Sequence, residues 1–179
     1  MPSRGLQARP PRAQRGDAEI AASVDAFRRI LREIRVMARK GELSTGLSAA
    51  QSFVLSVLID RPGASLNEIA EATITDRSSV AAVVDRLVEQ GYVVRETSPN
   101  DRRRASVSIT PAGRRAMRHA SSPPPTVALI NAMRSLDHNS RRSLSQGLTA
   151  LATAMGIGDE PAGMLFEDTV RSSSRRRRA

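Results

Sequence analysis

Two groups of residues in the middle of the chain could contact a phosphate backbone or the edges of nucleic-acid bases. One is Arg77-Ser78-Ser79, which directly follows Asp76, and the other is Asp101-Arg102-Arg103-Arg104. Guanidinium groups form paired hydrogen bonds with phosphates and with guanine, and the amides at a helix start attract anions. These residue types indicate a nucleic-acid-binding site at which no covalent bond is made or broken.

Other kinds of site have little support in the composition. The chain has no cysteine and only two histidines, His119 and His138, so neither a disulfide nor a metal site with three or four ligands can be assembled. There is also no Gly-rich phosphate loop and no recognisable His-acid-nucleophile set. We therefore predict a protein that is not an enzyme and needs no cofactor or metal.

The positive charge is concentrated at the two ends of the chain. The net charge is +10, but residues 1–16 contain four arginines and no acid, and residues 171–179 contain five arginines and no acid. The remainder has 19 basic and 18 acidic residues and is almost neutral. We expect 1–16 to be a disordered basic arm and 157–179 an irregular to disordered tail. These ends could attract phosphates or could only increase solubility.

The first group of residues is placed by a predicted pair of short helices. Ser65 and Glu68 have the spacing of a capping box, which opens a helix to about Ala72. After a turn, Asp76 or Thr75 caps a second helix that runs to Gln90 and stops at Gly91. A helix-turn-helix would present the start of this second helix to the major groove, although two helices that merely pack together would show the same pattern.

The second group is placed by a predicted hairpin. Strands are expected at Tyr92–Thr97 and Ala105–Ile109, joined by turn residues Ser98–Asp101, with the arginines at the tip. Thr110-Pro111 then begins a helix that reaches about His119. Arginines on a narrow arm could enter the minor groove, while the alternative is a charged hairpin that only blocks edge pairing.

Amphipathic helices flank these elements. The first is expected from Asp17 to about Lys40, with Gly41 as its stop and a connection at 42–47. A central apolar helix then begins at Ser48, which has the capping-box spacing with Gln51. Prolines 123–125 interrupt the helical pattern after His119. Two later helices are expected, one at about 126–135 and one from Asp137 onward. Apolar stripes on the first and last helices could pack within one chain, but a first helix of about 35 Å favours pairing between two chains. The stripe residues predicted at this interface are Ile20, Val24, Phe27, Leu31, Leu144, Leu148 and Leu151.

The order of elements resembles the MarR family of bacterial winged-helix transcription regulators from Asp17 to Gly156. The residues that carry the resemblance are Val84-Asp85-Arg86-Leu87, Gly91, Asp101-Arg102-Arg103 and Thr110-Pro111-Ala112-Gly113. The resemblance implies a mainly α fold with a small antiparallel β wing. It places a winged helix-turn-helix domain at about 47–113 and a dimerisation lobe in helices 17–40 and 114–156.

The resemblance also implies how DNA and an effector would be bound. A homodimer would hold a pseudo-palindromic operator in double-stranded DNA. A small, often anionic aromatic effector would bind between the lobes, with Arg28, Arg32 and His119 as candidate contacts. The recognition-helix residues would be Arg77, Ser78, Ser79, Ala82 and Arg86, and the wing residues would be Asp101, Arg102, Arg103 and Arg104.

Two features depart from the family pattern. Ala81-Ala82 stand where the family often has a larger polar or basic residue, and the three prolines interrupt what is often one long helix. We predict a homodimeric, sequence-specific, DNA-binding transcription regulator, expected to be a ligand-responsive repressor in a bacterial cytoplasm with no membrane segment. The alternative is a winged-helix module that binds proteins and has no DNA operator.

Overall fold

The structure is a computed structural model of the 179-residue chain. It describes residues 12–98, 101–120, 122–158 and 163–165; for 12–15, 97–98 and 101–105 it describes the backbone alone. The chain forms two compact units, residues 1–36 and 37–179. The disordered arm was predicted at 1–16: residues 1–11 lie outside the described residues, and 12–16 belong to a helix, so the prediction is wrong for them. Most of the tail predicted at 157–179 also lies outside the described residues.

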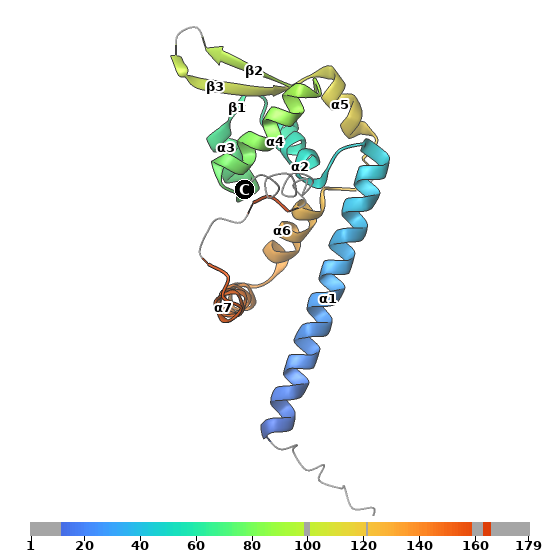
Figure 1. The fold of residues 1–179 in the computed structure, drawn as a ribbon, viewed down its shortest axis with the longest axis vertical. Coiled ribbons are helices and arrows are strands. Elements are labelled where there is room, and N and C mark those ends of the chain that lie inside the picture. The colour runs from blue at the N-terminus through green and yellow to red at the C-terminus, as the bar shows by residue number, and fades with distance from the viewer. Residues whose placement is uncertain (1–11, 99–100, 121, 159–162, 166–179) are drawn as a thin grey trace, which may run out of the picture. The chain divides into compact units, whose positions relative to one another are not determined.

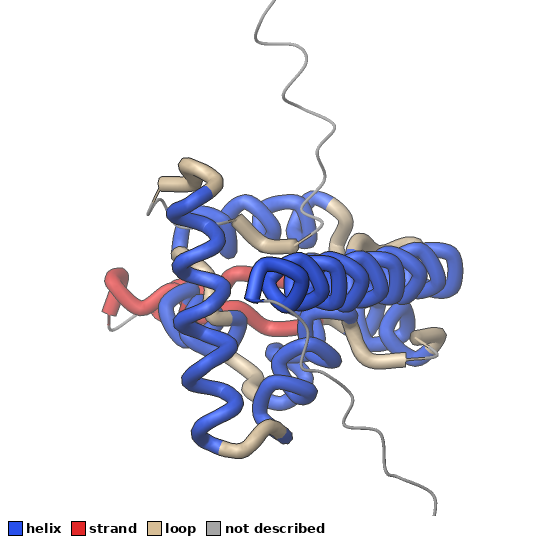
Figure 2. The backbone as a smooth tube through the Cα atoms, turned by 90° about the horizontal axis from the view of Figure 1, so that it is seen from below, coloured by secondary structure: helices blue, strands red, loops and turns tan. Residues whose placement is uncertain are grey.

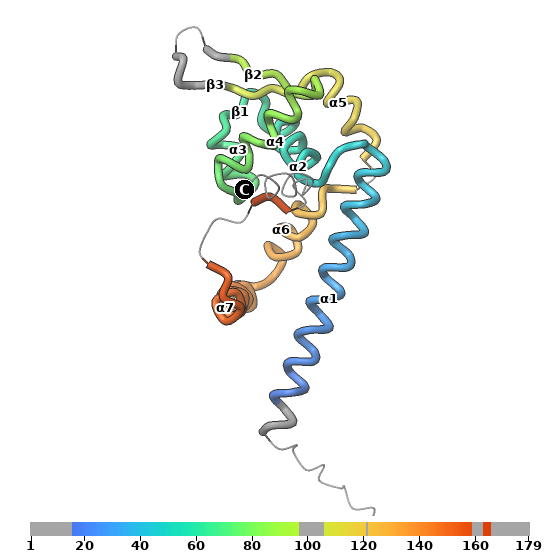
Figure 3. Tube along the Cα trace, in the orientation of Figure 1, coloured from blue at the N-terminus to red at the C-terminus, as the bar shows by residue number. Residues whose placement is uncertain are grey.

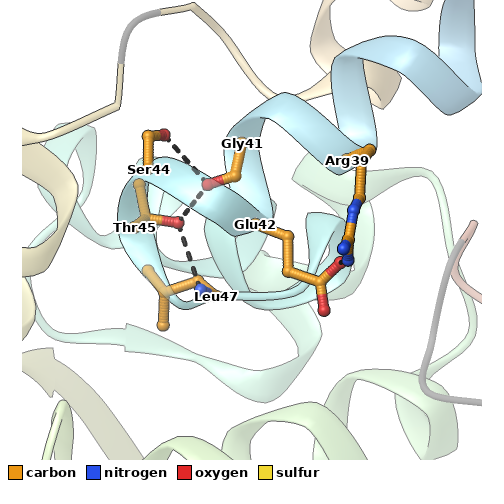
Figure 4. A network of polar contacts seen from close by, with 6 residues as sticks. All are labelled: Arg39, Gly41, Glu42, Ser44, Thr45 and Leu47. Carbon is orange, nitrogen blue, oxygen red and sulfur yellow. Dashed lines mark hydrogen bonds and ion pairs between the residues drawn. The ribbon is translucent and has the colours of Figure 1, made fainter.

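The first helix is longer than the sequence predicted. Helix α1 spans Arg12–Thr45, so the predicted stop at Gly41 and the predicted connection at 42–47 are wrong. Gly41 stays helical, and the left-handed residue that ends the helix is Gly46, with φ +71°. Thr45 closes the last turn: its hydroxyl donates to the carbonyl of Gly41 at 2.7 Å and accepts from the amide of Leu47 at 3.1 Å (Figure 4).

Helix α2, Ala49–Asp60, lies at the centre of the second unit. The predicted capping box is present: the amide of Gln51 donates to the Ser48 hydroxyl, and the Gln51 side chain accepts from the amide of Ser48. The helix is buried nearly all round, as its composition predicts, although Ile59 at its end is exposed. Its fully buried side chains include Val54, Leu55 and Leu58.

Helices α3 (Leu66–Thr73) and α4 (Arg77–Glu89) pack on α2, and the predicted cap residues Ser65 and Asp76 are confirmed. On α4, the side chains of Val80, Val83, Val84 and Leu87 are buried. Val88, near the end of α4, is exposed. We call α2 to α5 and the small sheet between them, residues 47–118, the winged-helix body (Figure 1).

The sheet has three antiparallel strands in the order β1-β3-β2. Strands β2 (Val93–Ser98) and β3 (Asp101–Ile109) form the predicted hairpin. Strand β1, Ala64–Ser65, was not predicted, because two residues carry no periodic pattern; it pairs Ala64 with Val107. Figure 2 shows how small this sheet is beside the helices.

Helix α5, Pro111–Arg118, begins as predicted, with Thr110 as its cap and proline in its first turn. Gly113 in that turn is buried against the sheet. A Cβ added there would overlap the carbonyl oxygen of Tyr92 and lie 2.9 Å from Cγ1 of Ile109. Glycine is therefore required here by the close approach of α5 to the strand, although its φ is not positive.

Helix α5 ends before the prolines, and Pro124 and Pro125 form the start of α6 (Pro125–Ser135), which α7 (His138–Ala154) follows. The hydroxyl and the amide of Ser140 donate to the carboxylate of Asp137, which caps α7. Every residue of α7 is exposed except Ala152, which is half-buried. Met164, beyond the helix, is buried in the core. The mainly α fold with a small antiparallel wing is confirmed.

None of the described helices alone has the length and apolarity of a membrane span. The bent pair formed by residues 16–45 and α2 reaches that length and composition only when the two helices are taken together.

Candidate nucleic-acid interface

The turn between α3 and α4 aims the start of α4 outward. Ile74 in this turn adopts the left-handed conformation, with φ 53° and ψ 48°, and its amide donates to the carbonyls of Ala70 and Glu71. This backbone region is unfavourable for a β-branched residue, and the Ile74 side chain is 70% exposed. The turn is held by these backbone bonds and by Thr73, whose buried hydroxyl donates to the carbonyl of Ile69 at 2.8 Å.

The first turn of α4 has an ordered set of hydrogen bonds around Asp76. Its carboxylate accepts from the Ser79 amide at 2.9 Å, from the Ser79 hydroxyl at 2.7 Å and from the Ser78 hydroxyl. These bonds, that from the Ser78 hydroxyl first, hold the pKa of Asp76 far below its ordinary value. Because both serine hydroxyls donate their protons to Asp76, their oxygen atoms can act towards other groups only as hydrogen-bond acceptors.

The other predicted recognition-helix residues are placed differently. Arg77 and Ser78 are exposed, while Ser79, Ala82 and Arg86 are half-buried. Arg86 has an interaction within the protein, so it is not simply a solvent-facing cation. The structure therefore brings the predicted residues onto one helix, with Arg77 as the most accessible cation at its start.

An ion pair that the sequence did not reveal joins α4 to the wing. Arg95 on β2 contacts Asp85 on α4, with 2.7 Å between Nη1 and Oδ1. Asp85 is more than half exposed and would otherwise place an uncompensated negative charge on the outer face of α4. Such an exposed pair adds little stability, so its consequence is mainly electrostatic. No local pattern predicts it, because the pairing depends on how β2 packs on α4.

A second long-range bond holds the other end of α4. The Gln51 side chain donates from Nε2 to Oε1 of Gln90 at 2.7 Å, while its own Oε1 serves the capping box of α2. Gln51 is buried, so both of its polar atoms are satisfied within the protein. The C-terminal end of α4 is thereby tied to the N-terminal end of α2.

The wing arginines lie in a strand, which corrects the prediction that they form the turn. Strand β3 begins at Asp101, so Arg102, Arg103 and Arg104 belong to it. The ladder pairs Thr97 with Ala105 but Ser98 with Asp101, which leaves 102–104 as extra residues on β3 at a register shift. Sequence propensity missed this because a bulge is set by pairing with β2. The side chains of 101–104 lie outside the described residues.

The second unit also contains a cavity of about 830 Å³. Its walls come from α2, α3, α5, the proline connection and α6. Apolar lining is given by Phe53, Val57, Met117 and Val127, and charged lining by Asp60, Arg61, Glu71 and Arg134. His119, a predicted effector contact, caps the end of α5 and does not line this cavity; Arg28 and Arg32 are exposed on α1.

The predicted interface stripes are accessible in the single chain. Ile20, Val24 and Phe27 on α1 are exposed and Leu31 is half-buried. Leu144, Leu148 and Leu151 on α7 are exposed as well. Within the described residues, no group of three or more His, Asp or Glu side chains is placed to hold a metal ion.

Comparison with known proteins gives a family match over the middle of the chain. Residues 45–104, which run from the end of α1 through the hairpin to the wing arginines, match the family model described as "MarR family". This part of the chain is similar to the MarR family. The matched region contains α2, β1, α3, α4 and β2, the elements that form the candidate interface.

A curated relative of this chain is the "Putative transcriptional regulatory protein for hcr operon" of Thauera aromatica. It is 40% identical over 83 residues, which cover 46% of this chain and 50% of that protein. The chain therefore spans about half the length of this relative.

Two solved structures share the fold. A "MepR like protein complexed with pseudoligands" is 20% identical with a TM-score of 0.52, covering 77% of this chain and 94% of that one. A MarR family transcription regulator, also 20% identical with a TM-score of 0.52, covers 80% and 94% of the two chains. At this identity the likeness shows the fold.

Proposed function

We propose that this chain is a homodimeric, sequence-specific DNA-binding transcription regulator of the MarR family, a repressor released by a small ligand. The observation that carries the proposal is the outward-facing first turn of α4 beside a hairpin that contains three consecutive arginines. The helix suits the major groove and the hairpin suits the minor groove or the backbone. The transcriptional regulator of Thauera aromatica supports the same function through its 40% identity.

The hydrogen bonds of the α4 cap indicate which base groups could be read. Ser78 and Ser79 donate to Asp76 and have lone pairs to offer. In the major groove, the hydrogen-bond donors are N6 of adenine and N4 of cytosine. Arg77 supplies the complementary type of contact, as a donor to guanine or to a phosphate. Because Ala82 is small, base reading is concentrated in this first turn.

The wing would supply sequence-independent affinity. Arg102, Arg103 and Arg104 would contact phosphates or a narrow minor groove, whose negative potential attracts guanidinium groups. Asp101 would orient one of these arginines through paired hydrogen bonds. The bulge at 102–104 supports this role, since extra residues on β3 move that segment out of the ladder.

Two copies would present two such DNA-binding surfaces. The exposed apolar side chains of α1 and α7 are the surfaces on which a second copy would pack. A two-fold dimer matches a pseudo-palindromic operator and binds both half-sites at high effective concentration.

The cavity is the candidate effector site within the second unit. Its walls include α3, which precedes the reading helix, and α6, which leads to the apolar stripe of α7. A ligand that fits one spacing of these walls better than another would shift the protein between DNA-binding and non-binding arrangements. Arg28, Arg32 and His119, the contacts predicted from the resemblance, do not line this cavity. They remain predicted contacts of an anionic effector.

The experiment is selection of DNA from a random pool by the full chain, followed by binding measurements on the selected site. We expect a palindromic site and a loss of about 1–3 kcal/mol in binding free energy for Arg103→Ala. The matched control is Arg118→Ala, an exposed arginine at the end of α5, which should bind as the wild type does. Failure to enrich any sequence would overturn the proposal and favour a protein-binding module.

A further inference from the structure

Asp85 lies on the face of α4 that would approach DNA. Ser78, Ala82 and Asp85 are spaced by four and then three residues, so they share one face of the helix. Asp85 is about 10 Å farther along the helix axis than Ser78, and the major groove is about 8.5 Å deep. With the start of α4 in the groove, Asp85 is therefore near the level of the phosphates. Its side chain is 57% exposed, so its charge is not shielded by the protein.

Arg95 places a positive charge directly beside this carboxylate. Its strand, β2, packs on α4, and Figure 3 shows the two elements side by side. Nη1 of Arg95 lies 2.7 Å from Oδ1 of Asp85. The Arg95 side chain is 36% exposed, less than that of Asp85, so the acid is the outer member of the pair. The pair therefore has no net charge at a place where Asp85 alone would be negative.

The pair is not needed to hold β2 in place. Val93 at the start of β2 is 1% exposed and belongs to the same apolar cluster as Leu87 of α4. The backbone ladder pairs Val93 with Ile109 and Arg95 with Val107. An exposed ion pair adds little to these contacts. Its effect is on the charge of the α4 surface, where an unpaired carboxylate would repel phosphates and lower the affinity for DNA.

We propose that Arg95 neutralises Asp85 so that α4 can approach the phosphates of duplex DNA. The choice of duplex DNA rests on the proposed function. Arg95 acts through Asp85 and does not touch the duplex, so it is a positioning residue for DNA binding. Sequence preference still comes from the first turn of α4, and the Arg95–Asp85 pair changes the affinity for every duplex sequence alike.

The first test is a set of charge changes at the two positions, made in the full chain. Arg95→Gln leaves the charge of Asp85 uncompensated. We expect about four- to twentyfold weaker binding of a mixed-sequence duplex at low salt, as for one unit charge about 10 Å from a phosphate. Arg95→Gln combined with Asp85→Asn carries neither charge and should bind within about twofold of the wild type. A double variant as weak as Arg95→Gln would show that Arg95 itself contacts the duplex and would overturn the proposal.

Two further variants separate the local charge from side-chain shape and from the net charge of the protein. Arg95→Lys keeps the positive charge on a side chain of another shape and should bind within about twofold of the wild type. Arg39→Gln is the matched control, because it breaks an exposed ion pair with Glu42 on α1 and leaves α4 and the wing unchanged. This variant should bind as the wild type does. A loss for Arg39→Gln equal to that for Arg95→Gln would reduce the effect to net charge and contradict the proposal.

Salt dependence and thermal melts give the readouts that distinguish repulsion from damage to the fold. The loss for Arg95→Gln should shrink as salt is raised from about 0.01 M to about 0.15 M, since the screening length falls from about 30 Å to about 8 Å. The Tm should stay close to that of the wild type, because an exposed ion pair adds little stability. A loss that does not change with salt, or one that accompanies a large fall in Tm, would show a structural role and rule out the proposal.

The operator selected from the random pool separates this inference from the proposed function. If an operator is selected and Arg95→Gln binds it as tightly as the wild type does, the inference alone fails. If no operator is selected but the charge changes have the expected effects on the mixed-sequence duplex, the proposed regulator fails and the role of Arg95 stands.

Discussion

The winged-helix body and helix α7 contain the same types of apolar residue, but the body buries them and α7 leaves them exposed. In the body, Leu58 and its neighbours on α2 are fully buried by the chain itself. On α7, Leu148 is 41% exposed, and Leu144 and Leu151 on the same face are exposed as well. The difference shows that the body is complete within one chain, whereas α7 has an apolar face that its own chain leaves uncovered.

The contrast also concerns what stabilises each helix. Helices of this length are marginal in water without tertiary packing, and most of their stability comes from covering an amphipathic face. Helices α2 and α4 obtain this from each other and from α3. Helix α7 has a well-formed cap at Asp137 but an exposed stripe, so its stability should depend on a second copy.

The largest expected effect comes from placing one methyl group in the body. In Gly113→Ala, the new Cβ would overlap the Tyr92 carbonyl oxygen, a backbone atom that cannot move cheaply. We expect a loss of about 3 kcal/mol in the free energy of unfolding, measured by urea denaturation. Helix propensity alone predicts a gain of up to about 1 kcal/mol, so the sign of the change decides between packing and propensity.

Gly147→Ala is the same substitution in α7, where a Cβ meets nothing within 4 Å. Here propensity should prevail, and we expect a gain of about 0.5–1 kcal/mol. Equal effects at the two glycines would contradict the contrast between a closed body and an open helix.

These two glycines show how far sequence reasoning reaches. Caps and stops with a fixed local spacing were predictable: Ser48 with Gln51, Ser65 with Glu68, Asp76, and Thr110 before Pro111. Each is made by residues within three positions of one another. The requirement for glycine at 113 depends on the backbone of Tyr92, which is distant in sequence, and no local pattern reports it.

The candidate site likewise has features that the sequence predicted and features that it did not. The start of α4 was predicted because Asp76, Arg77, Ser78 and Ser79 are consecutive. The Arg95–Asp85 ion pair, the Gln51–Gln90 bond and the bulge at 102–104 were not, because each depends on the register between separate elements. The predicted stop at Gly41 failed for a related reason: glycine permits a left-handed turn but does not impose one, and Gly46 takes that conformation.

A charge on the exposed face of α7 tests whether a second copy covers it. Leu148→Asp would place a carboxylate in the proposed dimer interface and should weaken dimerisation by about ten- to a hundredfold. The protein should be a smaller species in sedimentation and lose the rise of Tm with concentration that a dimer shows. Gln146→Asp adds the same charge on the opposite side of the helix and should leave assembly unchanged. A wild-type monomer at all concentrations would remove the dimer from the proposed function.

The smallest effect is expected from the two aspartates that cap α4 and α7, because neither residue is buried. Hydrogen bonds from the Ser78 hydroxyl and then Ser79 lower the pKa of Asp76, and those from Ser140 lower the pKa of Asp137. A carboxylate with a lowered pKa in the folded state contributes stability above its ordinary value of 3.8, and this contribution is lost as the pH falls below it. Asp76→Asn should therefore flatten the dependence of Tm on pH from about pH 4 downward.

Asp137→Asn should flatten the dependence of Tm on pH less than Asp76→Asn does when both are made in monomeric Leu148→Asp protein, since α7 is then separate from the cooperative core. If the Asn variants and the wild type lose Tm in parallel between pH 4 and pH 2, the caps do not couple protonation to folding.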